Sequence, residues 1–194
     1  MSHQSRVIAA NEYRRERWKN GTGWTREIVR VPETGDWDWR LSIAEIERDG
    51  PFSAFPGIDR ELVLIRGNGL RLRFDEGETR ELQPPHDRVR FAGERVVHGE
   101  LLDGPTHDFN LMWRRDAVNA ELLHRPLVGP MLFFTEPGIT WAIHLLAGQA
   151  KFDQDSGLPA LWAGDTALLV DGQTRQRYML EGGGEILAIK LSRL

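Results

Sequence analysis

Apolar and polar residues alternate along most of this chain, and this alternation limits the folds that it can adopt. Between residues 37 and 44, apolar residues occupy every second position: Trp37, Trp39, Leu41 and Ile43. A period of two places successive side chains on opposite faces of a strand, one of which can be buried. Gly and Pro interrupt such stretches at 49–51, 83–85, 103–105, 136–138, 155–157 and 182–184. Many short strands joined by turns predict an all-β sandwich or barrel, with short helices indicated only at 14–18 and 116–124.

The composition excludes several classes of protein. The chain has 194 residues, of which 40% are hydrophobic, and this fraction is too high for a disordered chain. Its formal net charge of −4 argues against a nucleic-acid partner, because such proteins usually present a basic surface. It contains no Cys, which excludes disulfides, thiolate nucleophiles, iron–sulfur clusters and zinc ribbons. No apolar run approaches the roughly 18 residues of a membrane-spanning helix, and no export signal opens the chain. We therefore expect a cytoplasmic protein without a membrane partner.

Two pairs of short motifs recur in the same order. Leu64-Ile65-Arg66-Gly67 is similar to Leu145-Leu146-Ala147-Gly148, and Phe91-Ala92-Gly93-Glu94 is similar to Trp162-Ala163-Gly164-Asp165. The Asn-Gly pair within residues 67–69 also predicts a hairpin between strands at 62–66 and 70–74. The recurrence favours an internal duplication with halves at 1–115 and 116–194, although short β patterns also coincide by chance.

The order of these motifs resembles that of the two motifs of the cupin family. Two copies would make a bicupin, an all-β chain with two cupin-like barrels or jelly-roll halves and few short helices. Cupin metal sites usually place two His one residue apart before the hairpin glycine. An acidic ligand usually follows about four residues later. If Glu61 is taken as that ligand, the two His positions hold Ala54 and Pro56, or Phe55 and Gly57. The His residues are dispersed, at 3, 86, 98, 107, 124 and 144. We expect no metal and no cofactor, although a site assembled from distant residues stays open.

The stretch 18–28 is the most unusual in the chain. A glycine-rich turn containing Asn20 leads directly into a predicted strand with Thr25, Arg26 and Glu27. Glycines let the backbone approach a ligand, and free N–H groups can bind an anion. The stretch is neither a Walker A loop nor a dinucleotide-binding fingerprint, because no helix follows it. A tight turn that leads into an edge strand is the alternative.

Two further segments carry candidate binding residues. In the loop 49–60, Phe52 and Phe55 are expected to form the wall of a pocket and Arg60 or Asp59 its polar end, unless the aromatic rings simply plug a barrel. In the predicted strand 108–112, Asp108 and Asn110 share one face. That face either binds a polar ligand or meets water, and the periodicity slightly favours water. Nucleophilic catalysis is not supported, whereas acid–base chemistry by a carboxylate stays open.

Four blocks of this sequence together resemble the HutD/Ves family. They are Trp18–Ile28, Trp39–Ala44, Asp49–Arg60 and Asp108–Met112, in the family's order and within residues 10 to 115. Thr22 departs from the pattern, which usually has glycine there, so close approach of a ligand to this residue is in doubt. From about residue 120 onward only the cupin-like strand pattern supports the resemblance.

The resemblance implies a metal-free bicupin linked to histidine utilisation. Such a protein is expected to bind an acidic metabolite, for example formiminoglutamate, and to limit expression of the pathway or flux through it. The carboxylates would need guanidinium groups and a cationic end would need a carboxylate. The clamp candidates are Arg26, Arg40 and Arg60, the counter-charges Glu27 and Asp108, and the neutral groups Asn20, Thr25, Ser42 and Asn110.

Three points stay open at this stage. Arg26 and Glu27 are adjacent, so only one of them can line a given pocket, whereas Arg40 and Ser42 share a face. A metal-independent isomerase or hydrolase that uses Glu27 or Asp108 as general base is the alternative function. A homodimer is also open, because cupins often dimerise.

Overall fold

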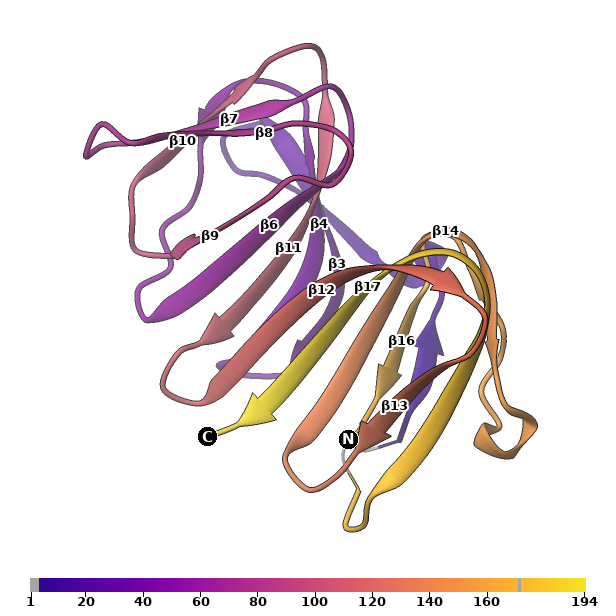
Figure 1. Ribbon diagram of the computed structural model, residues 1–194. Coiled ribbons are helices and arrows are strands. Elements are labelled where there is room, and N and C mark those ends of the chain that lie inside the picture. Colours follow the sequence, from indigo (N-terminus) through magenta and orange to yellow (C-terminus); the bar gives the residue numbers. More distant parts are fainter. Residues whose placement is uncertain (1–3, 171) are drawn as a thin grey trace. The chain divides into compact units, whose positions relative to one another are not determined.

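The computed structural model describes residues 4–170 and 172–194, and these residues form strands almost throughout (Figure 1). The helical segments of this part are two single 3₁₀ turns, η1 (Ala10–Glu12) and η2 (Gln154–Ser156). Neither is long or apolar enough to cross a membrane. The chain divides into two compact units. The first unit is Tyr13–Ala117, and the second unit combines Met1–Glu12 with Val118–Leu194.

The first unit contains two antiparallel sheets. The six-stranded sheet has the order β2 (Arg14–Arg17), β3 (Gly23–Val31), β4 (Trp39–Ile46), β11 (Thr106–Arg114), β6 (Ile58–Arg66) and β9 (Arg88–Ala92). The four-stranded sheet has the order β5 (Gly50–Pro51), β10 (Val97–Leu101), β7 (Leu70–Phe74) and β8 (Thr79–Leu82). Alternate residues of both sheets form one apolar core, which includes Leu62, Leu64, Leu70 and Leu72.

The second unit contains one seven-stranded sheet. Its main path is β1 (Arg6–Ile8), β16 (Thr166–Leu169), β14 (Ile139–Phe152), β17 (Gln176–Arg193) and β12 (Val118–Val128). β13 (Met131–Thr135) pairs with β17, and β15 (Leu161–Trp162) pairs with β14. Because β1 pairs with β16, the N-terminal strand groups with the C-terminal part of the chain. The expected halves, 1–115 and 116–194, placed this strand in the first half instead.

The two segments that indicated helices are strands. Residues 14–17 form β2, an exposed edge strand paired with β3. In β12, the alternate residues Val118, Ala120 and Leu122 are buried, whereas Asn119 and Glu121 are exposed. This period of two was present in the sequence, and the expectation of a helix there was wrong.

The hairpin expected around Asn68 is also absent from the described residues. β6 and β7 belong to different sheets, because β6 pairs with β11 and β9 while β7 pairs with β10 and β8. The glycines therefore form a corner between the sheets. Gly67 has a φ of +107°, and a Cβ at this position would lie 2.7 Å from the carbonyl oxygen of Pro105.

Replacing Gly67 by alanine is expected to destabilise the protein by more than about 1 kcal/mol, because the new methyl group meets backbone in a conformation that favours glycine. Urea denaturation measures this effect. Gly77→Ala is the matched control, since Gly77 also has a positive φ, of +89°, but a methyl group added there would have no atom within 4 Å. Equal losses in the two variants would show that only the backbone angle matters.

Each unit contains a turn with the same hydrogen-bond pattern. In the first unit, this turn is not the one that the sequence motifs indicated. In the second unit, the carboxylate of Asp165 accepts the N–H of Trp162 at 2.9 Å and its carbonyl accepts the N–H of Leu145 at 3.0 Å. In the first unit, Asp87 makes the same two bonds, with Gln83 at 2.9 Å and Leu64 at 2.9 Å. The counterpart of the 162–165 turn is therefore 83–87, and not 91–94.

Candidate ligand-binding site

A cavity of about 580 Å³ opens in the first unit, between the six-stranded sheet and the loops that follow β2 and β5. Eight of the residues expected at the site line it: Asn20, Thr25, Arg40, Ser42, Phe52, Phe55, Arg60 and Asn110. Three expected residues, Arg26, Glu27 and Asp108, do not line it. Eight lining residues were not among the candidates: Arg17, Trp18, Lys19, Ala44, Pro51, Ser53, Leu62 and Met112.

Strand register explains why distant residues meet on the cavity wall. Asn110 on β11 lies opposite Ser42 on β4 and opposite Leu62 on β6. Two residues along, Met112 lies opposite Arg40 and Arg60. Residues that face each other across antiparallel strands share a face of the sheet. The prediction that Arg40 and Ser42 act from the same face is therefore supported, and Arg60 joins them from the next strand but one.

Arg60 is a buried cation that has no acidic partner among the residues that the structure describes. Its side chain is 6% exposed, and its recorded hydrogen bond runs from Nη1 to the carbonyl oxygen of Ser53 at 3.3 Å. Nε has no partner, and no carboxylate of the described residues lies within ion-pair distance. The guanidinium carbon lies 5.2–5.5 Å from the ring centres of Phe52, Phe55 and Phe91. Burial, with a smaller effect of Arg40, lowers the pKa of Arg60 to about 10, so the group stays charged at neutral pH.

Arg40 is the second guanidinium on the cavity wall. Its Nε donates to Oε2 of Glu27 at 2.7 Å. Glu27 also lies 3.5 Å from Arg14 and 3.8 Å from Arg30. Glu27 therefore holds Arg40 in place and is not the counter-charge for a ligand that the sequence suggested.

Arg26 faces away from the cavity. Its Nε lies 2.9 Å from Glu45, and its guanidinium lies over the ring of Tyr13 at 5.9 Å. Neighbouring Thr25 lines the cavity, because successive side chains of a strand point to opposite faces. The prediction of Arg26 as part of the clamp is wrong for this reason.

Asp108 is sealed inside the protein. It is 0% exposed, and one carboxyl oxygen accepts the hydroxyl of Thr106 at 2.7 Å while the other has no partner. Burial raises the pKa of Asp108 to about 7, and the bond from Thr106 opposes this shift. Asn110 is 7% exposed, so the expectation that this face meets water was wrong. Asn110 reaches the cavity and Asp108 does not.

Two loops are joined at the edge of the cavity. The amide oxygen of Asn20 accepts the N–H and the hydroxyl of Thr22 at 3.1 and 2.8 Å, and its Nδ2 lies 3.4 Å from the carbonyl oxygen of Pro51. Trp18 donates to the hydroxyl of Thr25 at 2.8 Å. The residue with a positive φ is Gly21 and not Thr22, which explains why threonine fits there. Thr22 does not line the cavity.

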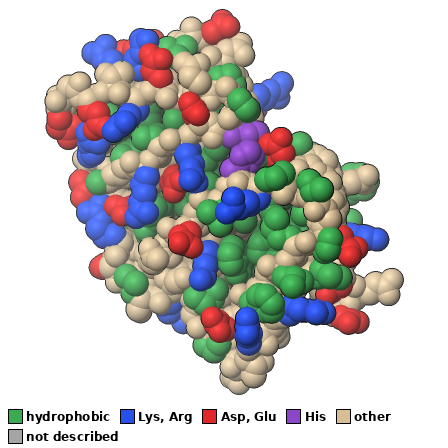
Figure 2. All heavy atoms as spheres, viewed as in Figure 1, with side chains coloured by type: hydrophobic (Ala, Val, Ile, Leu, Met, Phe, Trp, Pro, Cys, Tyr) green, Lys and Arg blue, Asp and Glu red, His purple; other side chains and the backbone are tan. Residues whose placement is uncertain are grey.

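Charged side chains on the surface of the first unit lie next to charges of opposite sign, which Arg60 does not. Acidic and basic side chains lie intermixed over its strands in Figure 2. Arg71 lies 2.7 Å from Glu81, and Arg73 lies 2.8 Å from Glu100. Exposed pairs of this kind contribute little to stability and leave no charge to be neutralised. The buried, uncompensated cation in the cavity is therefore unlike them.

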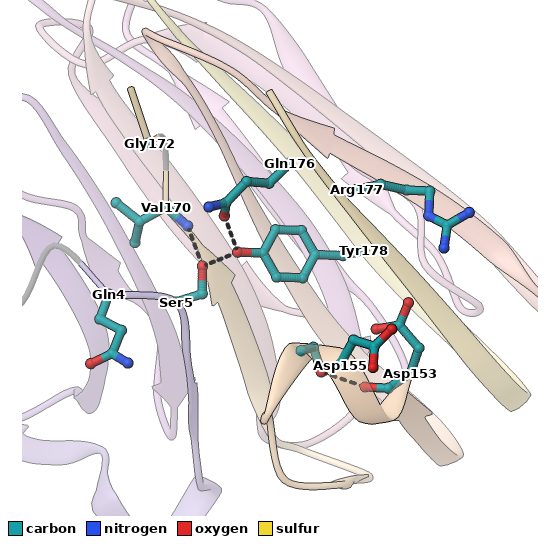
Figure 3. A pocket seen from close by; sticks show the side chains of 10 residues that line it. Gln4, Ser5, Asp153, Asp155, Val170, Gly172, Gln176, Arg177 and Tyr178 are labelled. Carbon is teal, nitrogen blue, oxygen red and sulfur yellow. Dashed lines mark hydrogen bonds between the residues drawn. The ribbon is translucent and has the colours of Figure 1, made fainter. Parts of the chain in front are cut away.

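A second cavity, of about 540 Å³, lies in the second unit (Figure 3). Its wall carries a chain of hydrogen bonds: the N–H of Val170 donates to Ser5, Ser5 contacts the hydroxyl of Tyr178 at 2.9 Å, and Tyr178 donates to Gln176 at 2.8 Å. Asp153, Asp155 and Arg177 line it as well. These hydroxyl groups already bond one another, so this cavity gives a weaker reason to expect a ligand.

Three polar residues of the first cavity, Arg60, Asn110 and Ser42, have apolar counterparts in the second unit, whereas Arg40 corresponds to Glu121. Corresponding register places Trp141 where Arg60 stands, because Trp141 pairs with Lys190 and Leu169 as Arg60 pairs with Met112 and Phe91. The ring of Trp141 packs on Phe133 at 5.2 Å. In the same register, Ala188 corresponds to Asn110 and Leu123 to Ser42. The second unit therefore carries the strand frame without the polar site.

Comparison with known proteins supports the resemblance found in the sequence. A protein of Pseudomonas putida, described as an uncharacterized 21.2 kDa protein in the hutC 3′ region, is 41% identical over 121 residues, which are 61% of this chain and 63% of that protein. Protein Ves of Cronobacter sakazakii is 42% identical over 106 residues, which are 54% of this chain and 58% of that protein. The chain thus matches less than two thirds of the length of each of these relatives.

Solved structures match nearly the whole chain. HutD from Pseudomonas fluorescens is 33% identical, with a TM-score of 0.84, over 98% of this chain and 99% of that one. The Escherichia coli pirin YhhW is 10% identical, with a TM-score of 0.71 over 97% of each chain, and this likeness concerns the cupin fold alone. The family model of HutD matches residues 10–188. This chain therefore belongs to the HutD family.

Proposed function

We propose that this chain is a cytoplasmic, small-molecule-binding regulatory protein of histidine catabolism. Its ligand is an acidic metabolite of that pathway, for which formiminoglutamate is the first candidate. The ligand occupies the cavity of the first unit, with a carboxylate on Arg40 and Arg60.

The observation that carries this proposal is the state of Arg60. An isolated charge is costly to bury, and buried cations are therefore usually paired. Arg60 is nevertheless buried beside a second guanidinium and has no carboxylate partner among the described residues. A carboxylate from outside the protein would neutralise Arg60 and also contact Arg40, through charge-assisted hydrogen bonds. The cavity, of about 580 Å³, has the size of a small-molecule site.

Family membership supports the link to histidine utilisation. The relative in Pseudomonas putida is named for its position in the hutC 3′ region. The regulatory role is the part of the proposal that the resemblance supplies.

The enzymatic alternative finds no support in the cavity. A general base must come within hydrogen-bond reach of the proton that it removes. Within residues 4–170 and 172–194, no Asp, Glu or His lines the cavity. We therefore propose the binding function and not the enzymatic one.

We also propose that the two units are two cupin barrels of one bicupin. The matching bonds of Asp87 and Asp165 support this, as does the matching register shift at Asp108 in β11 and at Leu145 in β14.

The proposal predicts that an acidic intermediate of histidine breakdown raises the melting temperature. A ligand at 100 times its Kd stabilises the folded state by about 2.7 kcal/mol. Arg40→Ala should remove most of this shift, because one of the two guanidinium groups is lost. Glu27 keeps Arg14 and Arg30 as neighbours in this variant. Differential scanning calorimetry with formiminoglutamate and with urocanate measures the effect.

Arg73→Ala is the matched control, since Arg73 is an exposed arginine on β7 and does not line the cavity. It should bind as the unchanged protein does. If no intermediate shifts the melting temperature, or if Arg40→Ala binds undiminished, the proposed site is wrong. A chromosomal Arg40→Ala substitution should also alter expression of the histidine-utilisation genes, which tests the regulatory part.

A further inference from the structure

The turn between β2 and β3 places an asparagine directly before a glycine at the edge of the first cavity. Asn20 is exposed, and Gly21 is half-buried with a φ of +71°. An asparagine followed by glycine readily loses its side-chain amide, because the glycine has no side chain to shield the backbone nitrogen that attacks Cγ. The sequence contains one other such pair, Asn68-Gly69.

Two donors hold the side-chain oxygen of Asn20. It accepts the N–H of Thr22 at 3.1 Å and the hydroxyl of Thr22 at 2.8 Å. A bond to the N–H two residues along the chain folds the asparagine side chain back over the residue between them, here Gly21. Attack on Cγ converts this oxygen into an oxyanion, and donors that already point at it stabilise the new charge. Thr22 therefore favours the reaction at Asn20.

The other contacts of this turn restrain the reaction only weakly. The amide nitrogen of Asn20, which has to leave, lies 3.4 Å from the carbonyl oxygen of Pro51. The N–H of Gly21 donates to the carbonyl oxygen of Trp18 at 3.0 Å, and this bond has to open before the nitrogen can attack. Single bonds in exposed turns open at little cost in free energy.

Asn68 has the same neighbour in sequence but different surroundings. Its Nδ2 donates to Oδ2 of Asp103 at 3.1 Å, and the structure records no donor to its side-chain oxygen within the described residues. The carboxylate of Asp103 opposes a negative charge that develops on Asn68. Asn68 is therefore a matched reference within the same chain, and it should react more slowly than Asn20.

We infer that Asn20 is a site of spontaneous deamidation, by which the protein loses affinity for acidic ligands as it ages. The nitrogen of Gly21 forms a bond to Cγ of Asn20. The Cγ–Nδ2 bond then breaks, and the amide leaves as ammonia with the proton of the Gly21 nitrogen. Water opens the resulting succinimide at either carbonyl group, which leaves aspartate or isoaspartate at position 20. Water is the only co-reactant.

The product changes the charge at the edge of the cavity. The basic side chains that line this cavity are Arg17, Lys19, Arg40 and Arg60. A new carboxylate beside them competes with an acidic ligand for the same cations and repels it. The donor to Pro51 that joins the two loops is lost as well. This effect on binding rests on the proposed function, whereas the deamidation itself does not.

Peptide mapping by mass spectrometry tests the modification in the full chain, incubated at mildly alkaline pH. Trypsin releases residues 20–26 and 67–71 as separate peptides, each with one asparagine. Residues 20–26 should be deamidated before 67–71. Thr22→Val should slow the reaction at Asn20 by about threefold or more, because one donor to the oxyanion is lost, and should leave Asn68 unchanged.

Two results would overturn the modification site. One is an Asn20 that reacts no faster than Asn68 in the unchanged protein, which decides the matter even if the variant does not fold. The other is an Asn20 that reacts at the same rate in a folded Thr22→Val.

Titration calorimetry tests the effect on binding, with formiminoglutamate and with urocanate as probes. Asn20→Asp reproduces one product and should weaken binding by about threefold or more. Asn68→Asp is the control, since Asn68 does not line the cavity and its replacement should leave the affinity unchanged. Unchanged affinity in Asn20→Asp contradicts the effect on binding. If the unchanged protein binds neither acid, the proposed function and this effect both fail, while the rates at Asn20 and Asn68 still decide the modification.

Discussion

Replacing Arg60 by methionine should abolish the binding of organic acids and, at the same time, stabilise the ligand-free protein. Removing one partner of a buried charge pair costs about 2–5 kcal/mol of binding free energy, so affinity should fall at least about 30-fold. Without ligand the same cation is uncompensated, and methionine would instead bury an apolar chain against Phe52, Phe55 and Phe91. Exchanging buried charges for apolar residues stabilises some proteins by about 1–4 kcal/mol.

Two measurements check this pair of effects. Titration calorimetry follows the loss of affinity, and urea denaturation without ligand follows the free energy of unfolding. Arg73→Met, at an exposed position of β7, should change neither by more than about 0.5 kcal/mol. A variant Arg60→Met that still binds acids, or that unfolds more easily than the unchanged protein, would contradict the role assigned to Arg60.

Asp108→Asn should change how stability depends on pH. Burial raises the pKa of Asp108 from 3.8 to about 7. Between these values the unfolded chain releases the proton while the folded protein keeps it, so the free energy of unfolding falls as pH rises. A shift of this size corresponds to about 4 kcal/mol, fully expressed above pH 7 and absent below pH 4. Asparagine cannot ionise, so the variant should gain stability over the unchanged protein at pH 8 and not at pH 3.5.

Denaturant titrations at several pH values between 3.5 and 8 measure this difference. The exposed substitution Asp116→Asn provides the control, and it should leave the pH profile as it is. The opposite result, a variant that is less stable at pH 8, would show that the ionised carboxylate of Asp108 supports the fold.

The strands were predictable where apolar and polar residues alternate in the sequence, as in Trp39–Ile46, although residues 41–44 of this strand are buried on both faces. The same pattern in β12 was overlooked, and β2 has none because all its residues are exposed. The hairpin expected at Asn68 failed for a different reason. An Asn-Gly pair fixes a turn locally, but which strands then pair is decided by distant partners, here β11 and β10.

The site was predictable as a set of segments, and less so as a set of side chains. Alternation along a strand correctly placed Arg40 and Ser42 on one face. It could not decide between Asp108 and Asn110, which share a face, because depth within the barrel separates a sealed group from one at the cavity. Nor could it show that Glu27 is occupied by Arg40, since that contact depends on how β3 pairs with β4.

The rings of Phe52, Phe55 and Phe91 have a consequence for how tightly the cavity can bind a ligand. They take the place of hydration water around the guanidinium of Arg60. This cation is therefore dehydrated once, when the chain folds, and not again at each encounter with a ligand. Binding of the proposed carboxylate would then have to strip water mainly from that ligand, because the side chain is already held in place. Arg60 is thus preorganised, because the free-energy cost of dehydrating it is met during folding and does not reduce the affinity for a ligand.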